Sequence, residues 1–300
     1  MALFSKLFKE KSIPGNVDAN LYKVKTYHSL DLASKDNPIS QLIKNKRDVV
    51  RVKNAVSRKV QKELLKLFSD VRQKESHRLD TYGMFPKSFV TNSLTGGEPQ
   101  DYFSKTKAIQ TEVKSFLGFD LECFLLNILT SLNNGKSIKT KEVGKKGGRK
   151  FNYFQFRALN KKEEIFRVHC ENMFFDWVAK DLNYLENDKF KENPIAFFIL
   201  LQKSEGGELS LFDKRWEQGQ RAEALASGFD QIISNNGKEI NDCSPKGIKR
   251  QLIDAEECEM ILFNGGEIWH NIEKIKSSNE RITVGAFLEI SEEGNHLVWI

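Results

Sequence analysis

Hydrophobic and polar positions divide the chain into two unlike parts. In residues 55–76, apolar positions recur at the three- and four-residue spacing of an amphipathic helix. Residues 105–117 repeat that pattern, and residues 118–132 are apolar enough for a buried helix. We therefore expect residues 1–135 to form a helical or mixed region that packs on a core formed elsewhere.

From residue 150 onward the pattern changes to short runs rich in aromatic and β-branched residues. Gly, Asn, Asp or Pro separates several of these runs, as is typical of strands joined by turns. The runs are 151–159, 164–171, 194–202, 207–213, 258–265, 267–275 and 282–290. Many short strands at this spacing predict a sandwich or barrel over residues 150–300. The expected fold is mainly β with flanking α, in one domain overall.

Two polar intervals interrupt this order. Residues 133–150 mix glycine and asparagine with lysine, which predicts an exposed loop. Residues 214–250 are polar and weakly helical, and they separate two core strands. A long insertion at such a place is often functional, so a lid and a passive insertion both remain open for residues 214–250.

Composition narrows the classes of partner. The net charge of +6 is spread along the chain, and no nucleic-acid-binding motif accompanies it, so we expect a small-molecule substrate and no nucleic acid. No apolar run approaches the roughly 18 residues of a membrane span, so we expect no membrane partner. The four cysteines form no CxxC pair, which favours a reducing cytoplasm over a disulfide framework.

Candidate metal ligands lie in the β-like half. His169 and Glu171 are two positions apart in the run RVHCEN, and residues at i and i+2 of a strand share a face. His270 lies in a distant run and supplies a third ligand. Two histidines and one carboxylate on one side of a metal form the facial triad of non-haem iron(II) oxygenases. The H-x-E pair alone is weak evidence, because a lone histidine in a strand is usually structural.

A second group of residues follows the distal histidine. Arg281 and Thr283 alternate along the run ERITVGAFLEI, which places both side chains on one face of a strand. A guanidinium fork beside a hydroxyl suits a carboxylate that is buried near the metal.

With these residues the chain resembles the 2-oxoglutarate- and iron(II)-dependent oxygenases, in their prolyl-hydroxylase-like branch. The matching segments are HCE at 169–171, KSEGGELSLF at 203–212, ILFNGGEIWH at 261–270 and RIT at 281–283. The resemblance covers residues 150–290, about half of the chain.

The resemblance implies a double-stranded β-helix, or jelly roll, with helices outside it. It implies that His169, Glu171 and His270 bind Fe(II), and that Arg281, helped by Thr283, binds the far carboxylate of 2-oxoglutarate, with O2 as the other co-substrate. A residue on the preceding strand often contacts 2-oxoglutarate; we expect Tyr153, with Gln155 or Asn152 as alternatives.

The carboxylate at position 171 bears on the reaction. Aspartate is the more usual ligand in the family, and glutamate here is a departure. Glycine or alanine at this position would indicate a halogenase, with chloride in the vacancy. The expected activity is therefore hydroxylation of an unactivated C–H bond in a small molecule such as an amino acid or a natural-product intermediate.

Two other functions fit a metal-binding jelly roll less completely. A cupin-like metalloenzyme that does not use 2-oxoglutarate would keep the metal ligands but would not need Arg281. A metal-free binding protein on the same fold would need none of these residues. Co-substrate dependence and stoichiometric iron distinguish the three. The sequence does not indicate an oligomeric state.

Overall fold

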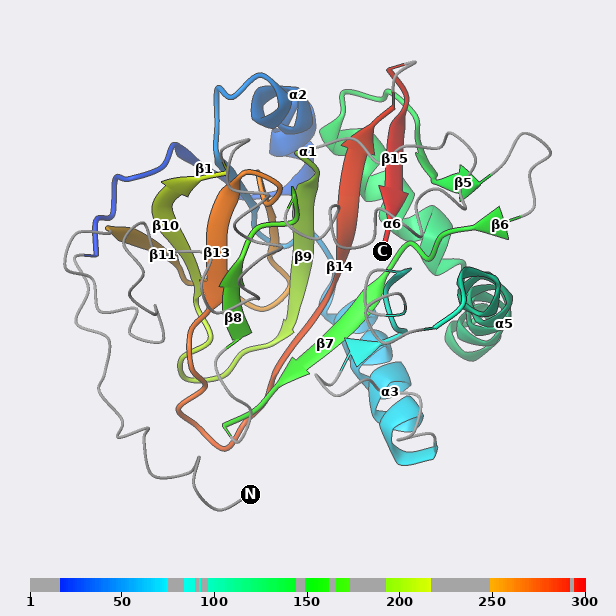
Figure 1. Ribbon diagram of the computed structural model, residues 1–300. Helices are drawn as coiled ribbons and strands as arrows, with labels where there is room; N and C mark the ends of the chain where they lie inside the picture. Colours follow the sequence, from blue (N-terminus) through cyan, green and yellow to red (C-terminus); the bar gives the residue numbers. More distant parts are fainter. Residues whose placement is uncertain are drawn as a thin grey trace.

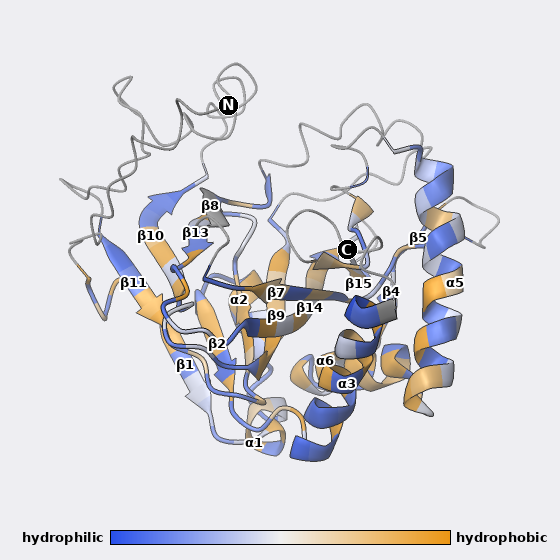
Figure 2. Cartoon of the chain, turned by 90° about the horizontal axis from the view of Figure 1, so that it is seen from below, coloured by the Kyte–Doolittle hydropathy of each residue, from blue (hydrophilic) through white to orange (hydrophobic). Residues whose placement is uncertain are grey.

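The computed structural model describes residues 17–74, 84–89, 92, 97–143, 149–161, 166–172, 193–216, 249–291 and 294–300. Two β-sheets face each other, and helices cover the outer side of the larger sheet (Figures 1 and 2). The expected architecture, mainly β with flanking helices, is confirmed.

The larger sheet runs in the order β1-β2-β12-β9-β14-β15-β4, with β7 paired to β14 and β3 paired to β7. Its strands are β1 (Val24–Tyr27), β2 (Val49–Val52), β3 (Met84–Phe85), β4 (Ile138–Thr140), β7 (Gln155–Leu159), β9 (Ile195–Gln202), β12 (Met260–Phe263), β14 (Arg281–Ile290) and β15 (His296–Trp299). Strand β2 pairs with β12, so the first third of the chain and the β-rich half share one sheet.

The smaller sheet has the order β11-β10-β13-β8. Its strands are β8 (Phe166–His169), β10 (Leu209–Arg215), β11 (Arg250–Ile253) and β13 (Ile268–Ile272). A separate hairpin pairs β5 (Glu142–Val143) with β6 (Arg149–Lys150). Because β8 and β13 are antiparallel neighbours, residues far apart in sequence lie directly opposite each other in this sheet.

Five described helices accompany the sheets. They are α1 (Leu30–Ser34), α2 (Pro38–Ile43), α3 (Arg58–Lys74), α5 (Pro99–Leu117) and α6 (Leu121–Leu132). Asp120 caps α6, since its carboxylate accepts the Cys123 N–H at 3.1 Å. Gly118 ends α5 with φ of 68°, a left-handed conformation that glycine adopts without a side-chain clash. Figure 2 shows α3, α5 and α6 on the side of the larger sheet that faces away from the smaller one.

Two apolar layers follow from the alternation of side chains along each strand. One lies between the sheets and includes Leu209, Leu211, Ile261 and Phe263. The other lies between the larger sheet and the helices, and it contains the residues of β14 that alternate with Arg281 and Thr283, such as Ile282. The faces of β14 are therefore unequal, and the polar residues face the smaller sheet.

The expected helices and strands are largely present. The helices at 55–76, 105–117 and 118–132 correspond to α3, α5 and α6, and the seven expected runs each contain a strand. Residues 134–137 form an exposed turn, but the prediction of an exposed loop is wrong for the middle of the interval, because β4 pairs with β15 and Lys141 is buried against Glu289. Most of the 214–250 insertion, residues 217–248, lies outside the described residues.

No single helix in the described ranges is long and apolar enough to cross a membrane. The pair α5 and α6, bent by 89°, passes on length and composition only when the two are taken together. Both helices bury apolar residues within the protein, including Val113 and Leu129.

Candidate metal centre and co-substrate site

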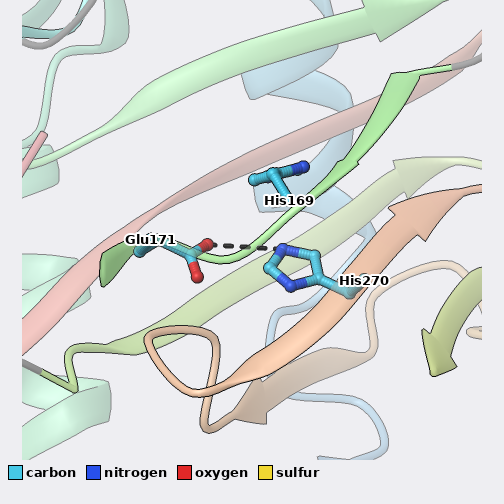
Figure 3. Close-up of side chains that lie close together, drawn as sticks. All are labelled: His169, Glu171 and His270. Atoms are coloured by element: carbon cyan, nitrogen blue, oxygen red, sulfur yellow. Dashed lines mark ion pairs between the residues drawn. The ribbon is translucent and has the colours of Figure 1, made fainter. Parts of the chain in front are cut away.

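The two candidate histidines lie opposite each other on neighbouring strands. His169 at the end of β8 is the direct partner of His270 in β13. Cross-strand partners point to the same face of a sheet, so both imidazoles face the interior between the two sheets. Their ring centroids are 4.4 Å apart, and both side chains are buried (Figure 3).

Glu171 completes the cluster just beyond the end of β8. Its Oε1 lies 3.4 Å from His270 Nε2, and one ligand atom from each of the three residues lies within 4.8 Å of the others. Figure 3 shows the carboxylate and the His270 ring pointing toward each other. The structure thus brings together the three residues that the sequence singles out.

The His270 ring is held in one orientation. Its Nδ1 lies 2.8 Å from the carbonyl oxygen of Ile268, an acceptor, so Nδ1 carries the proton and donates it. The edge of the Phe263 ring packs against the imidazole, with centroids 4.8 Å apart. A donor bond from one ring nitrogen leaves the other, here Nε2, as a lone pair directed at the cluster, which is the arrangement of metal-binding histidines.

Gly265 makes room for the glutamate carboxylate. A Cβ at this position would lie 2.5 Å from Glu171 Oε2, closer than side chains approach one another. We expect Gly265→Ala to displace the carboxylate and weaken Fe(II) binding at least about tenfold, the scale of a disturbed ligand environment. The measurement is an anaerobic Fe(II) titration. Undiminished affinity would contradict this packing argument.

Arg281 and Thr283 lie on the inner face of β14, as their alternation predicts. Both side chains are buried. Among the described residues no carboxylate forms an ion pair with the Arg281 guanidinium, which lies over the Phe198 ring at 5.0 Å from its centroid. Burial, and then the charge of Arg157, lowers the pKa of Arg281 to about 9, so the guanidinium remains protonated at neutral pH.

The structure does not bring Tyr153 to this site. Tyr153 belongs to the apolar layer on the helix side of the larger sheet. Burial and the carboxylates of Glu122 and Asp120 raise the pKa of Tyr153, so its hydroxyl lies near the first turn of α6. The side-chain alternation of β7 does not extend back to Tyr153. Regular β7 begins only at Gln155, and because the stretch before it is irregular, Tyr153 faces the helix side although it lies two positions before inward-facing Gln155.

The two alternatives to Tyr153 already have amide partners. Gln155 lies on the inner face by its pairing with Gly285, but its Nε2 donates to the Pro86 carbonyl at 2.9 Å. The Asn152 amide donates to the Phe154 carbonyl at 2.6 Å. The inner-face residue that sequence reasoning missed is Arg157, the cross-strand partner of Thr283. The sequence signal for Arg157 is its position two residues after Gln155, since residues i and i+2 of a strand point to the same face.

This fold and this cluster define a non-haem Fe(II)- and 2-oxoglutarate-dependent oxygenase. Residues 23–299 match the model of a family described as the carrier-protein-independent halogenase WelO5, and the chain belongs to that family. Its cofactor is Fe(II), and its co-substrates are 2-oxoglutarate and O2.

Solved structures share the fold. An N-substituted L-amino acid dioxygenase from Burkholderia ambifaria AMMD aligns with a TM-score of 0.56 and 14% identity, covering 91% of this chain and 92% of that one. A complex of a dioxygenase with the same description and source with alpha-KG aligns with a TM-score of 0.53 and 15% identity, covering 89% and 91%. No curated protein sequence matches the chain.

Proposed function

We propose that this protein hydroxylates an unactivated C–H bond of a small molecule, with Fe(II) held by His169, Glu171 and His270. The observation that carries the proposal is the buried cluster itself. Its carboxylate has one oxygen, Oε2, without a hydrogen-bond partner in the described part of the chain. A buried carboxylate in that state is costly unless a cation lies beside it, and a divalent metal between Glu171 and the two histidines would supply one.

The site also fits 2-oxoglutarate. Arg281 is a buried, protonated guanidinium that forms no ion pair with a described carboxylate, although the more distant Glu208 acts on its charge, and Thr283 offers a hydroxyl on the same face. Gly207 packs against the stem of Arg281, since a Cβ there would lie 2.7 Å from Arg281 Cδ. We infer that Arg281 and Thr283 bind the far carboxylate of the co-substrate, because a bidentate carboxylate would neutralise the buried charge.

The residues around the site have two roles, which are to hold the metal and to exclude water. When bound, Fe(II) would activate O2, which is the oxidant, and 2-oxoglutarate would be the co-reductant that is oxidised together with the C–H bond. His169, Glu171 and His270 would hold the metal and leave coordination positions for the co-substrates. The Ile268 carbonyl fixes the His270 tautomer, and Phe263 keeps water from the same ring.

Glu171 favours hydroxylation over halogenation. The family is described by a halogenase, yet halide transfer needs a coordination position for the halide on the metal. The family resemblance implies that glycine or alanine at residue 171 would leave room for chloride on the metal. In this chain the Glu171 carboxylate takes that room instead. With that position filled by Glu171, hydroxyl transfer is the outcome that we propose.

We infer that the substrate carries an anionic group, as an amino acid or an acidic natural-product intermediate does. Arg157 lies on the inner face beside Thr283, and its charge contributes to the lowered pKa of Arg281. Whatever other contacts Arg157 makes, the positive charge of two arginines on one face attracts anions. Succinate release, screened against amino acids, N-substituted amino acids and peptides, tests this class of substrate.

Replacement of the distal histidine tests the metal assignment. Wild-type protein with Fe(II) and 2-oxoglutarate under argon should show a weak visible charge-transfer band, and His270→Ala should abolish it, because one of three protein ligands is lost. His28→Ala is the matched control, since His28 is exposed and outside the cluster. A band of wild-type intensity in His270→Ala would refute the assignment.

A further inference from the structure

The Glu171 carboxylate lacks the polar support that metal-binding carboxylates usually have. Such ligands are ordinarily held in place by hydrogen bonds from surrounding residues. Here Oε2 is buried and accepts no hydrogen bond from the described residues. Within the described part of the chain, the orientation of the carboxylate therefore depends on the contact of Oε1 with His270, on the backbone that carries Glu171 and on the atoms packed against it.

That backbone is tied to the turn between β12 and β13. The Glu171 N–H donates to the Gly265 carbonyl at 3.1 Å, and the Asn172 N–H donates to the Gly266 carbonyl at 3.4 Å. The Gly266 N–H in turn donates to the Pro194 carbonyl at 2.9 Å. Three segments distant in sequence are thus bonded side by side immediately behind the metal cluster.

A reciprocal pair of asparagines closes this arrangement. The Asn172 amide donates to Asn193 Oδ1 at 2.6 Å, and the Asn193 backbone N–H donates to Asn172 Oδ1 at 2.7 Å. Asn172 is 0% exposed, so these bonds form where no water competes. Gly266 fits beneath the pair, because a Cβ there would lie 2.4 Å from Asn193 Cα.

We propose that the Asn172–Asn193 pair is the positioning device of the Glu171 carboxylate. Asn172 follows Glu171 directly, so a side chain locked at 172 limits rotation of the backbone that carries the ligand. Since the described residues give Oε2 no hydrogen bond, the side chain of Glu171 resists that rotation only through the contact of Oε1 with His270 and the packing of Oε2 against Gly265. Both residues act through Glu171 and are positioning residues. The inference rests on the proposed role of Glu171 as an iron ligand.

Asn193→Gly is the sharpest test of this pair. Asn193 has φ of 64°, a conformation that glycine keeps without strain, so the substitution removes the amide and spares the backbone. Asn54→Gly is the matched control, because Asn54 has φ of 52° and is exposed outside the cluster. The measurements are the Fe(II) dissociation constant, by anaerobic competition with a chelator, and thermal unfolding of the metal-free protein.

We expect Asn193→Gly to weaken Fe(II) binding about 10- to 100-fold, the range for lost support of a metal ligand. Asn54→Gly should stay within about twofold of wild type. Asn193→Asp retains an oxygen acceptor for the Asn172 amide and should restore most of the affinity. In Asn172→Ala/Asn193→Gly, the losses should not add, because Asn172→Ala removes both bonds of the pair, including the one that Asn193→Gly removes.

Two failures are distinguishable. If wild-type protein binds Fe(II) through His270 but folded Asn193→Gly binds it within twofold of wild type, the positioning role is wrong and the proposed function survives. If His270→Ala binds Fe(II) as tightly as the wild type does, the proposed function itself is wrong. Should Asn172→Ala fail to fold, Asn193→Gly alone decides.

Discussion

Glu171→Gly should remove hydroxylation and make the metal centre responsive to halide. The substitution deletes a negatively charged ligand and leaves a vacancy beside Gly265, which also lacks a side chain. An anion of halide size can then enter and restore the lost charge. We expect succinate-coupled product to fall at least about 100-fold, the effect of losing a group that acts directly at the reacting centre.

The halide response can be measured before any substrate is known. In Glu171→Gly, which has lost one of the three protein ligands, added chloride or bromide should restore the charge-transfer band of the Fe(II)–2-oxoglutarate complex saturably by taking the vacant position, and the band of wild type should not respond. Glu171→Asp keeps a carboxylate and is the control that should remain insensitive. An equal halide response in wild type would show that Glu171 does not occupy the halide position.

The membership of this chain in a family described by a halogenase does not decide its reaction. A fold and a family constrain the cofactors, whereas the outcome depends on particular side chains at the metal. The difference concerns one residue, Glu171, and the space that Gly265 leaves for its longer arm. We therefore base the proposal of hydroxylation on the ligand set and not on the family description.

Residue composition predicted much of the fold, because most strands of the β-rich half lie in runs of aromatic and β-branched residues, several of them separated by turn residues. The runs that contain β9, β13 and β14 are long enough to be recognised in this way, although β9 and β13 are buried almost throughout and do not alternate. Strands β1 and β2 have four residues each, and β3 has two, so their patterns are too short to stand out. Strand β1 pairs with β2, β2 with β12 and β3 with β7, and these stabilising contacts lie outside any local window of the sequence.

The same limit applies to the site. His169 and Glu171 were recognisable by their spacing, and His270 and Arg281 by their order along the chain. Tyr153 was misplaced because one irregular stretch before β7 reverses which side chains face inward. Asn172 and Asn193 carry no local signal at all, since their amides meet only when the two segments lie side by side. Spacings of two or four residues predict which side chains share a face. Hydrogen bonds between segments distant in sequence cannot be predicted from such spacings and are seen only in the folded structure.

Arg281→Met should have opposite effects on the free protein and on co-substrate binding. The guanidinium is buried without an ion pair in the described part of the chain, so in the absence of 2-oxoglutarate it is a cost to folding. Methionine has a similar stem and no charge, so the melting temperature of the free variant should equal or exceed that of wild type. Affinity for 2-oxoglutarate should fall by about 2–5 kcal/mol, or at least ~30-fold, because a buried charge pair is lost.

Thermal unfolding with and without 2-oxoglutarate, in the presence of Fe(II) under argon, measures both effects. At 100 times its dissociation constant the co-substrate should stabilise wild type by about 2.7 kcal/mol, and the variant should lose most of this gain. Arg51→Met is the contrasting control: Arg51 pairs with buried Glu259 at 2.7 Å, so its loss should lower the melting temperature and leave the gain from 2-oxoglutarate intact. If free Arg281→Met unfolds well below wild type, Arg281 has a structural partner, and the assignment of its charge to the co-substrate would have to be abandoned.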